Sequence, residues 1–259
     1  MWTDRFAPQR FKHPPLTVIL VVLVISATPT LTRAGSFVQY QSGTESVRAY
    51  LAAPVGTGPF PAIIVIHEAW GLNSWIQEKT DFLAGQGYVT LAIDLYRGKT
   101  PSEGAEAHAL MRGLPDARVE QDLSASMEYL KSLRDVKPNQ IAVLGWQMGG
   151  GYALSMAIRT PALSACIVAY GRLVSDPTSI QRINCPILAI FGSDDRTIPS
   201  LSVMAFERAC VAAGKMITVK IYPGVGQSFM DETNPKTYNV DATSNAWDRI
   251  FVFLATTTR

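Results

Sequence analysis

The sequence predicts one α/β domain built on a mostly parallel, doubly wound sheet. Short apolar runs rich in β-branched residues alternate along the chain with stretches of helical periodicity, which is typical of parallel strands joined by crossover helices. A length of 259 residues fits one such domain, and 47% hydrophobic residues can fill its core. The chain also contains no internal repeat and no low-complexity linker that would divide it.

Residues 1–34 differ from the rest and are predicted to form an export signal, which leaves residues 35–259 as the domain. Basic residues precede an apolar run, Leu16 to Ile25, and small, turn-forming residues follow it, the order found in secretory signal peptides. The run is shorter than the roughly 20 residues of a membrane-spanning helix. We therefore expect cleavage after Ala27 or Ala34 and a periplasmic or secreted protein. An uncleaved N-terminal membrane anchor is the alternative.

The elements of the domain are predicted in chain order. Residues 37–52 alternate and are more polar, which predicts an antiparallel pair of strands at one edge of the sheet. Buried parallel strands are expected at six apolar runs, namely 62–66, 88–93, 141–144, 165–170, 187–191 and 217–222. Apolar residues at helical spacing predict a helix capped by Asp116 that extends to about residue 133, and a final helix near residues 246–254.

Composition excludes several kinds of partner. A formal net charge of +2, with scattered Lys and Arg residues, gives no field suited to nucleic acid. No metal-ligand cluster or phosphate-binding fingerprint is present in the sequence, so neither a metal nor an organic cofactor is expected. Cys166 falls in a predicted strand, Cys185 just before another and Cys210 in a predicted helix, and we expect buried, unbridged thiols.

Four of the predicted strands end in polar segments. These are HEAWGL after residues 62–66, GWQMGG after 141–144, GSDDRTIP after 187–191 and PGVGQSFMDE after 217–222. In doubly wound sheets, ligands bind outside the carboxyl ends of the strands. The last three segments follow the order of nucleophile, acid and histidine loops in the α/β-hydrolase fold, where the nucleophile lies in a Gly-x-nucleophile-x-Gly turn.

From about Ser36 to the C-terminus the chain resembles the dienelactone hydrolase family, a branch of the α/β-hydrolase fold that uses a Cys-His-Asp triad. HEAWGL resembles the family's oxyanion loop, in which a glutamate, here Glu68, assists the cysteine. GSDDRTIP resembles the acid loop, with Asp195 as the acid, and YPGVGQSFMDETNPKTYN resembles the histidine loop. The resemblance implies hydrolysis of small lactones or esters, including those that carry a carboxylate.

The chain departs from this pattern at two positions. GWQMGG places Gln147 at the nucleophile position, and a neutral amide has no lone pair nucleophilic enough to form an acyl-enzyme. Gln227 occupies the histidine position, and a carboxamide cannot cycle a proton near neutral pH. The triad mechanism is therefore predicted to be unavailable to this chain.

No other residue is expected to replace the triad. His13 lies in the predicted signal, His108 lies in a predicted helix, and His67 is expected to be structural beside the oxyanion loop. Ser193 and Ser228 lie in the predicted site loops, but the sequence supplies no base for them, and no GxSxG motif occurs. The cysteines lie at core positions.

Other parts of the site are predicted to persist. The backbone N–H groups of Ala69 and Met148 should form an oxyanion hole, because the fold sets their direction. Arg97 is predicted to anchor an acidic ligand, or else to be a solvated loop residue. Trp70 and Trp146 are expected to wall the pocket or to fill core.

Asp195, without a histidine, should pair with the Gln227 amide or with Arg196, or else cap a turn.

Three hypotheses for function follow. In the first, the chain is a catalytically silent binding or structural protein, whose pocket is formed by Glu68, Ala69, Gln147, Met148, Asp195 and Gln227. In the second, it is a weak hydrolase in which Glu68 or Asp195 activates water against a retained oxyanion hole. In the third, the two glutamines replace the Cys and His of an active parent.

Overall fold

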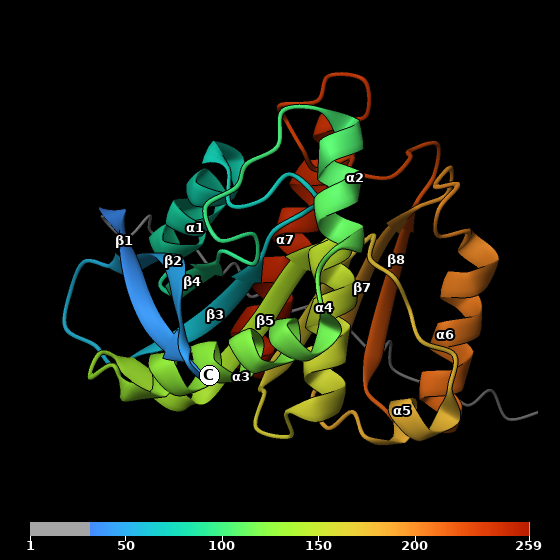
Figure 1. Cartoon of the computed structure of the whole chain (residues 1–259). Coiled ribbons are helices and arrows are strands. Elements are labelled where there is room, and N and C mark those ends of the chain that lie inside the picture. Colours follow the sequence, from blue (N-terminus) through green and yellow to red (C-terminus); the bar gives the residue numbers. More distant parts are fainter. Residues whose placement is uncertain (1–31, 259) are drawn as a thin grey trace, which may run out of the picture.

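The computed structural model describes residues 32–258. A single eight-stranded sheet runs through the domain (Figure 1). Its strand order is β1-β2-β4-β3-β5-β6-β7-β8. The strands are β1 (Thr32–Ser42), β2 (Glu45–Pro54), β3 (Phe60–Ile66), β4 (Val89–Ile93), β5 (Val136–Trp146), β6 (Ala165–Ala169), β7 (Ile187–Gly192) and β8 (Ile217–Tyr222). This confirms the predicted α/β class and all six predicted parallel strands.

The direction of pairing changes near one edge of the sheet. β1 pairs with β2 and β2 with β4 in antiparallel register, whereas β4, β3, β5, β6, β7 and β8 pair in parallel. The central strands β3, β4, β6 and β7 are buried on both faces, which explains their continuous apolar runs. The antiparallel pair predicted at residues 37–52 is confirmed as β1 and β2.

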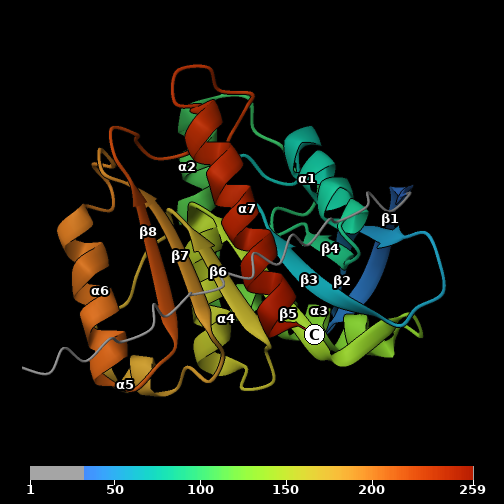
Figure 2. The same ribbon diagram turned by 180° about the vertical axis from the view of Figure 1, so that it is seen from behind.

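Helices cover both faces of the sheet. α1 and α7 lie on the face turned to the viewer in Figure 2, and α3 and α4 lie on the face nearer in Figure 1. The helices are α1 (Ser74–Gly85), α2 (Gly104–Arg112), α3 (Asp116–Ser132), α4 (Met148–Arg159), α5 (Pro177–Gln181), α6 (Ser200–Ala212) and α7 (Val240–Thr257). Within the described part of the chain, no helix combines the length and apolar character needed to cross a membrane.

Two predicted boundaries differ from the structure. Asp116 is the first residue of α3 rather than its cap, because Pro115 holds the extended N-cap conformation. The domain boundary predicted at residue 34 falls inside β1, which begins at Thr32 and pairs there with Pro54. The rest of the predicted signal lies outside the described residues.

Candidate functional site

The turn between β5 and α4 places Gln147 at the carboxyl end of the sheet. Gln147 has φ 49° and ψ −112°, a conformation that costs a non-glycine residue about 1–3 kcal/mol. The flanking glycines allow the chain to pack tightly: a Cβ on Gly149 would lie 2.2 Å from the Ile66 carbonyl oxygen, and one on Gly145 would lie 2.1 Å from that of Gly149. The predicted strained elbow is therefore confirmed.

The Gln147 side chain turns toward the oxyanion loop. Its Oε1 accepts a hydrogen bond of 3.2 Å from the backbone N–H of Ala69, and its own backbone N–H donates to the Ala169 carbonyl at 2.9 Å. Met148 begins α4, so its N–H is one of the first-turn donors that have no partner within the helix. The structure thus brings Ala69, Gln147 and Met148 together, and one of the two predicted oxyanion donors is bound by the elbow residue itself.

Glu68 is buried beside Ala69 in the oxyanion loop. The residue is 3% exposed, and its Oε1 accepts a hydrogen bond of 3.0 Å from the Tyr170 hydroxyl. Burial, reinforced by the nearby Asp231 carboxyl and opposed by the Tyr170 hydrogen bond, raises the pKa of Glu68 to about 8. The Glu68 carboxyl is therefore mostly protonated at neutral pH, which makes it a poor general base there.

Tyr170 links Glu68 to the second glutamine. Gln227 Nε2 donates to the Tyr170 carbonyl at 3.4 Å, while the Tyr170 hydroxyl binds Glu68. Tyr170 is fully buried, has a φ of 40° and directly follows β6. Neither Tyr170 nor Asp231 is among the residues predicted for the site, although both follow strands at the edge where the other site loops lie.

Asp195 caps its own loop. Its Oδ1 accepts hydrogen bonds from the backbone N–H groups of Thr197, at 2.7 Å, and Ile198, at 2.9 Å. Its Oδ2 is buried and has no hydrogen-bond partner within residues 32–258. The turn-capping prediction is confirmed, and pairing with Gln227 or Arg196 is wrong, since Gln227 bonds to Tyr170 instead.

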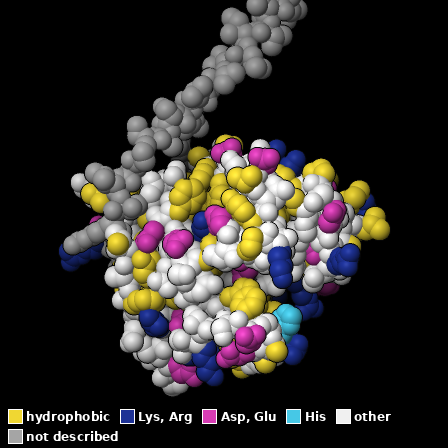
Figure 3. Space-filling view, turned by 90° about the horizontal axis from the view of Figure 1, so that it is seen from above, with side chains coloured by type: hydrophobic (Ala, Val, Ile, Leu, Met, Phe, Trp, Pro, Cys, Tyr) yellow, Lys and Arg dark blue, Asp and Glu magenta, His cyan; other side chains and the backbone are white. Residues whose placement is uncertain are grey.

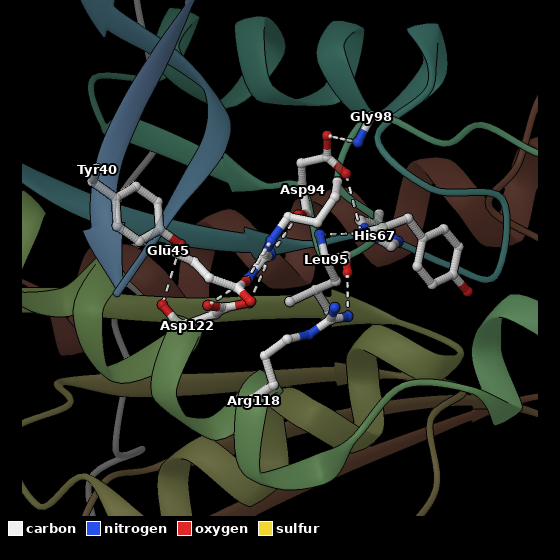
Figure 4. A network of polar contacts seen from close by, with 10 residues as sticks. Tyr40, Glu45, His67, Asp94, Leu95, Gly98, Arg118 and Asp122 are labelled. Atoms are coloured by element: carbon white, nitrogen blue, oxygen red, sulfur yellow. Dashed lines mark hydrogen bonds and ion pairs between the residues drawn. The ribbon is translucent and has the colours of Figure 1, made fainter. Parts of the chain in front are cut away.

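Arg97 does not lie free at the site. Its guanidinium forms ion pairs with Asp122, at 2.8 Å, and with Glu45, at 2.9 Å; Asp122 and Glu45 lie in the polar network of Figure 4, together with Asp94 and Arg118. Asp122 is 1% exposed, so this arginine neutralises a buried carboxylate. The structure therefore contradicts the predicted role of Arg97 as a ligand anchor.

The two tryptophans predicted for the site lie in different surroundings. Trp146 is fully buried and packs against Trp75 and Trp247, with ring centroids 5.2 and 6.0 Å away, so it fills core and does not wall the pocket. Trp70 is half-buried in the oxyanion loop and stays a candidate for the pocket wall.

His67 and His108 are not placed to act as bases at the elbow. His67 is fully buried; its Nε2 accepts a hydrogen bond from the Leu95 N–H at 3.2 Å, so its Nδ1 carries the proton and donates to the Glu68 carbonyl at 2.6 Å. His108 is exposed on α2. The expected structural role of His67 is confirmed.

The surroundings carry no strong charge of one sign. Viewed from above in Figure 3, acidic, basic and apolar side chains are interspersed over this face. Among residues 32–258, no group of three or more His, Cys, Asp or Glu side chains is placed to hold a metal ion. Cys166, Cys185 and Cys210 are buried and unbridged, as predicted.

The elbow and the order of the loops fit the α/β-hydrolase pattern, and comparison with known proteins identifies the family. A family model described as "Dienelactone hydrolase family" matches residues 47–258. The chain belongs to the dienelactone hydrolase family. Its similarity to members of this family extends over most of the domain.

Two curated relatives and one solved structure illustrate that similarity. A Bradyrhizobium protein named "Probable 2-oxo-3-(5-oxofuran-2-ylidene)propanoate lactonase" is 31% identical, with 87% of this chain and 95% of the relative covered. "Protein usf" of Aquifex pyrophilus is 30% identical, with 85% and 97% covered. A dienelactone hydrolase-like promiscuous phosphotriesterase from metagenomic libraries superposes with a TM-score of 0.80 at 21% identity, over 87% of this chain and 98% of that one. At that identity the structural likeness shows the α/β-hydrolase fold alone.

Proposed function

We propose that this dienelactone hydrolase family member binds small, neutral carbonyl compounds without turning them over by the family's triad. The observation that carries the proposal is the hydrogen bond from the Ala69 N–H to Gln147 Oε1. The side chain at the nucleophile position has no nucleophilic atom, and its own carbonyl oxygen takes the donor that would otherwise stabilise a substrate oxyanion.

The geometry favours this function over weak hydrolysis by an activated water. Glu68, with its pKa raised to about 8, holds its proton at neutral pH and cannot accept one from water. Asp195 Oδ1 is bound by two backbone N–H groups, and Oδ2 is buried. Neither carboxyl group is therefore suited to act as a base on a water at the elbow.

One feature supports the hypothesis that the two glutamines replaced the Cys and His of an active parent. Asp195 Oδ2 is buried and has no hydrogen-bond partner among the described residues, as expected of an acid whose histidine has been replaced. Such a history leaves the proposed function of the present chain unchanged.

The experiment uses 4-nitrophenyl acetate and the purified protein. A chain with no acyl-enzyme step should release 4-nitrophenol without a burst and at the same rate as its Gln147→Ala variant. A burst stoichiometric with protein would overturn the proposal, because it requires a covalent intermediate. Turnover at neutral pH that disappears in Glu68→Gln or Asp195→Asn would instead establish the water-activation route.

We further propose export, followed by signal cleavage after Ala27. Cleavage there leaves β1 whole, whereas cleavage after Ala34 removes the residues that pair with Pro54 and Ala53. The N-terminal mass of the protein recovered from the periplasm or the medium tests this, and retention of Met1 in a membrane fraction would favour the anchor.

A further inference from the structure

The orientation of both site carboxamides is fixed by their partners. Gln147 accepts from the Ala69 N–H, so the atom facing Ala69 must be the oxygen. Gln227 donates to the Tyr170 carbonyl, so the atom facing Tyr170 must be the nitrogen. Exchanging O and N in either amide would set two donors or two acceptors against each other. The unbound ends are therefore Gln147 Nε2, a donor, and Gln227 Oε1, an acceptor.

Both unbound ends reach the surface of the site. Within residues 32–258, neither Gln147 Nε2 nor Gln227 Oε1 bonds to another group, and neither belongs to the buried side-chain atoms that have no partner. Both side chains are half-buried. Each glutamine thus presents one amide group to a ligand and uses the other to hold its position.

The two glutamines are held on consecutive carbonyl groups. The Gln147 backbone N–H bonds to Ala169 O at 2.9 Å, and Gln227 Nε2 bonds to Tyr170 O at 3.4 Å. The chain bends at Tyr170, where φ is 40°. The Gln147 backbone and the Gln227 side chain are therefore bound to adjacent residues, Ala169 and Tyr170, at the end of β6.

The charges at the site favour a neutral ligand. Glu68, Asp195 and Asp231 are 3%, 4% and 7% exposed, and all three lie in the loops of the site. The Arg97 guanidinium, the cation predicted for an acidic ligand, is bound by Asp122 and Glu45. A carboxylate would bring its negative charge toward the Asp195 and Asp231 carboxyl groups and would place an acceptor against the Gln227 acceptor.

We propose that the site binds compounds with a cis-amide edge, such as lactams and cyclic imides, in preference to lactones of the same ring size. The ligand carbonyl accepts from Gln147 Nε2, and the ligand N–H donates to Gln227 Oε1. A lactone places a ring oxygen where the lactam has its N–H, so two acceptors face each other and one hydrogen bond is lost. This inference rests on the proposed function, since it requires a ligand that is bound and not cleaved.

The test compares δ-valerolactam, N-methyl-δ-valerolactam and δ-valerolactone by ligand-observed NMR titration of the purified protein. The lactam should bind about tenfold more tightly than the other two, the difference expected from one hydrogen bond gained and one repulsive contact avoided. Methionine is close to glutamine in size but has no amide group. Gln227→Met should therefore give the lactam and the lactone equal affinities. Lactone binding should rise slightly, because the variant also removes the repulsive contact between two acceptors.

Matched controls separate the possible failures. Gln181→Met, on the exposed end of α5, should leave all three affinities unchanged, and thermal unfolding confirms that each variant is folded. Equal affinity for lactam and lactone, no binding of either, or a tenfold preference that persists in Gln227→Met would each overturn the inference. Appearance of 5-hydroxypentanoate in the lactone spectra would count against the proposed function and not against the preference.

Discussion

The backbone N–H of Ala69 donates a hydrogen bond of 3.2 Å to Gln147 Oε1. In the α/β-hydrolase fold this donor lies in the loop that serves the oxyanion of a reacting ester. Here the carbonyl oxygen of Gln147 takes the place of a substrate oxygen. The elbow residue itself therefore occupies this donor.

Restoring both triad positions should restore hydrolysis. We expect Gln147→Cys with Gln227→His to raise kcat/KM for small esters or lactones by at least about 10³-fold, and either change alone to recover little, because triad residues act as a unit. The reason for the gain is that Asp195 Oδ2 is buried and unpartnered, so it can orient the new imidazole. Adding Asp195→Asn to the double variant should remove most of the gain, whereas an undiminished rate would show that Asp195 is not the acid.

Gln147 should be one of the few positions in or next to α4 where glycine stabilises the fold more than alanine. Both Gln147→Gly and Gln147→Ala lose the bond to Ala69, but only glycine relieves the φ of 49°. Relief of about 1–3 kcal/mol outweighs the roughly 0.5–1 kcal/mol that glycine adds to the flexibility of the unfolded chain. Urea denaturation measures the difference. The same pair at Ser155, inside α4, should show the opposite order by about 1 kcal/mol.

The buried Glu68 should make the protein less stable as pH rises from about 4.5 to about 8. In this window native Glu68 keeps its proton, with a pKa of about 8, while the unfolded chain releases it. The unfolded state then binds fewer protons, so the free energy of unfolding falls by at most about 1.4 kcal/mol per pH unit and levels off above the native pKa.

Glu68→Gln is the matched comparison for that pH dependence. The amide oxygen can still accept from the Tyr170 hydroxyl, but the side chain no longer titrates. The difference in unfolding free energy between variant and parent, measured by denaturant titration at several pH values, should therefore grow in favour of the variant between pH 5 and 8. A difference that stays constant would mean that Glu68 is already ionised in the native state.

The parts of the fold that could be predicted from the sequence are those that leave a periodic or local mark. Buried parallel strands are continuous apolar runs, so β3, β4, β6 and β7 were identifiable, and the elbow was identifiable from Gly145 and Gly149. Side-chain partners distant in sequence leave no such mark: the Tyr170 to Glu68 bond joins residues 102 apart. The ion pair of Arg97 could not be predicted for the same reason, because its partner Glu45 lies 52 positions away.

Replacing Arg97 should lower stability and leave ligand binding unchanged. Arg97→Gln leaves Asp122, which is 1% exposed, without its cation, and removing one partner of a buried ion pair costs about 3–5 kcal/mol. Arg159→Gln is the control, because Arg159 and Glu120 are both partly exposed and such pairs contribute about 0–1 kcal/mol. Urea denaturation measures the expected loss of stability, and the lactam titration measures whether ligand binding is unchanged. A loss of lactam binding in folded Arg97→Gln would show that Arg97 takes part in ligand binding.

Two glycines close together in α4 should respond in opposite ways to alanine. A Cβ on Gly149 would lie 2.2 Å from the Ile66 carbonyl and 2.7 Å from that of His67. Both are backbone atoms at the end of β3, so either the helix or the oxyanion loop must move, and we expect Gly149→Ala to cost at least about 2 kcal/mol. At Gly151 the nearest atom is the Arg172 Cβ at 3.3 Å, on an exposed side chain.

Gly151→Ala should therefore be neutral or stabilising by up to about 1 kcal/mol, because alanine is the better helix former. Displacement at Gly149 also separates the Ala69 N–H from Gln147 Oε1, since residues 66–69 carry that donor. Amide hydrogen exchange at Ala69 should accordingly accelerate in Gly149→Ala and stay at the parent rate in Gly151→Ala. Unchanged protection of Ala69 in a destabilised Gly149→Ala protein would mean that the close contact of α4 with β3 does not set the position of the oxyanion loop.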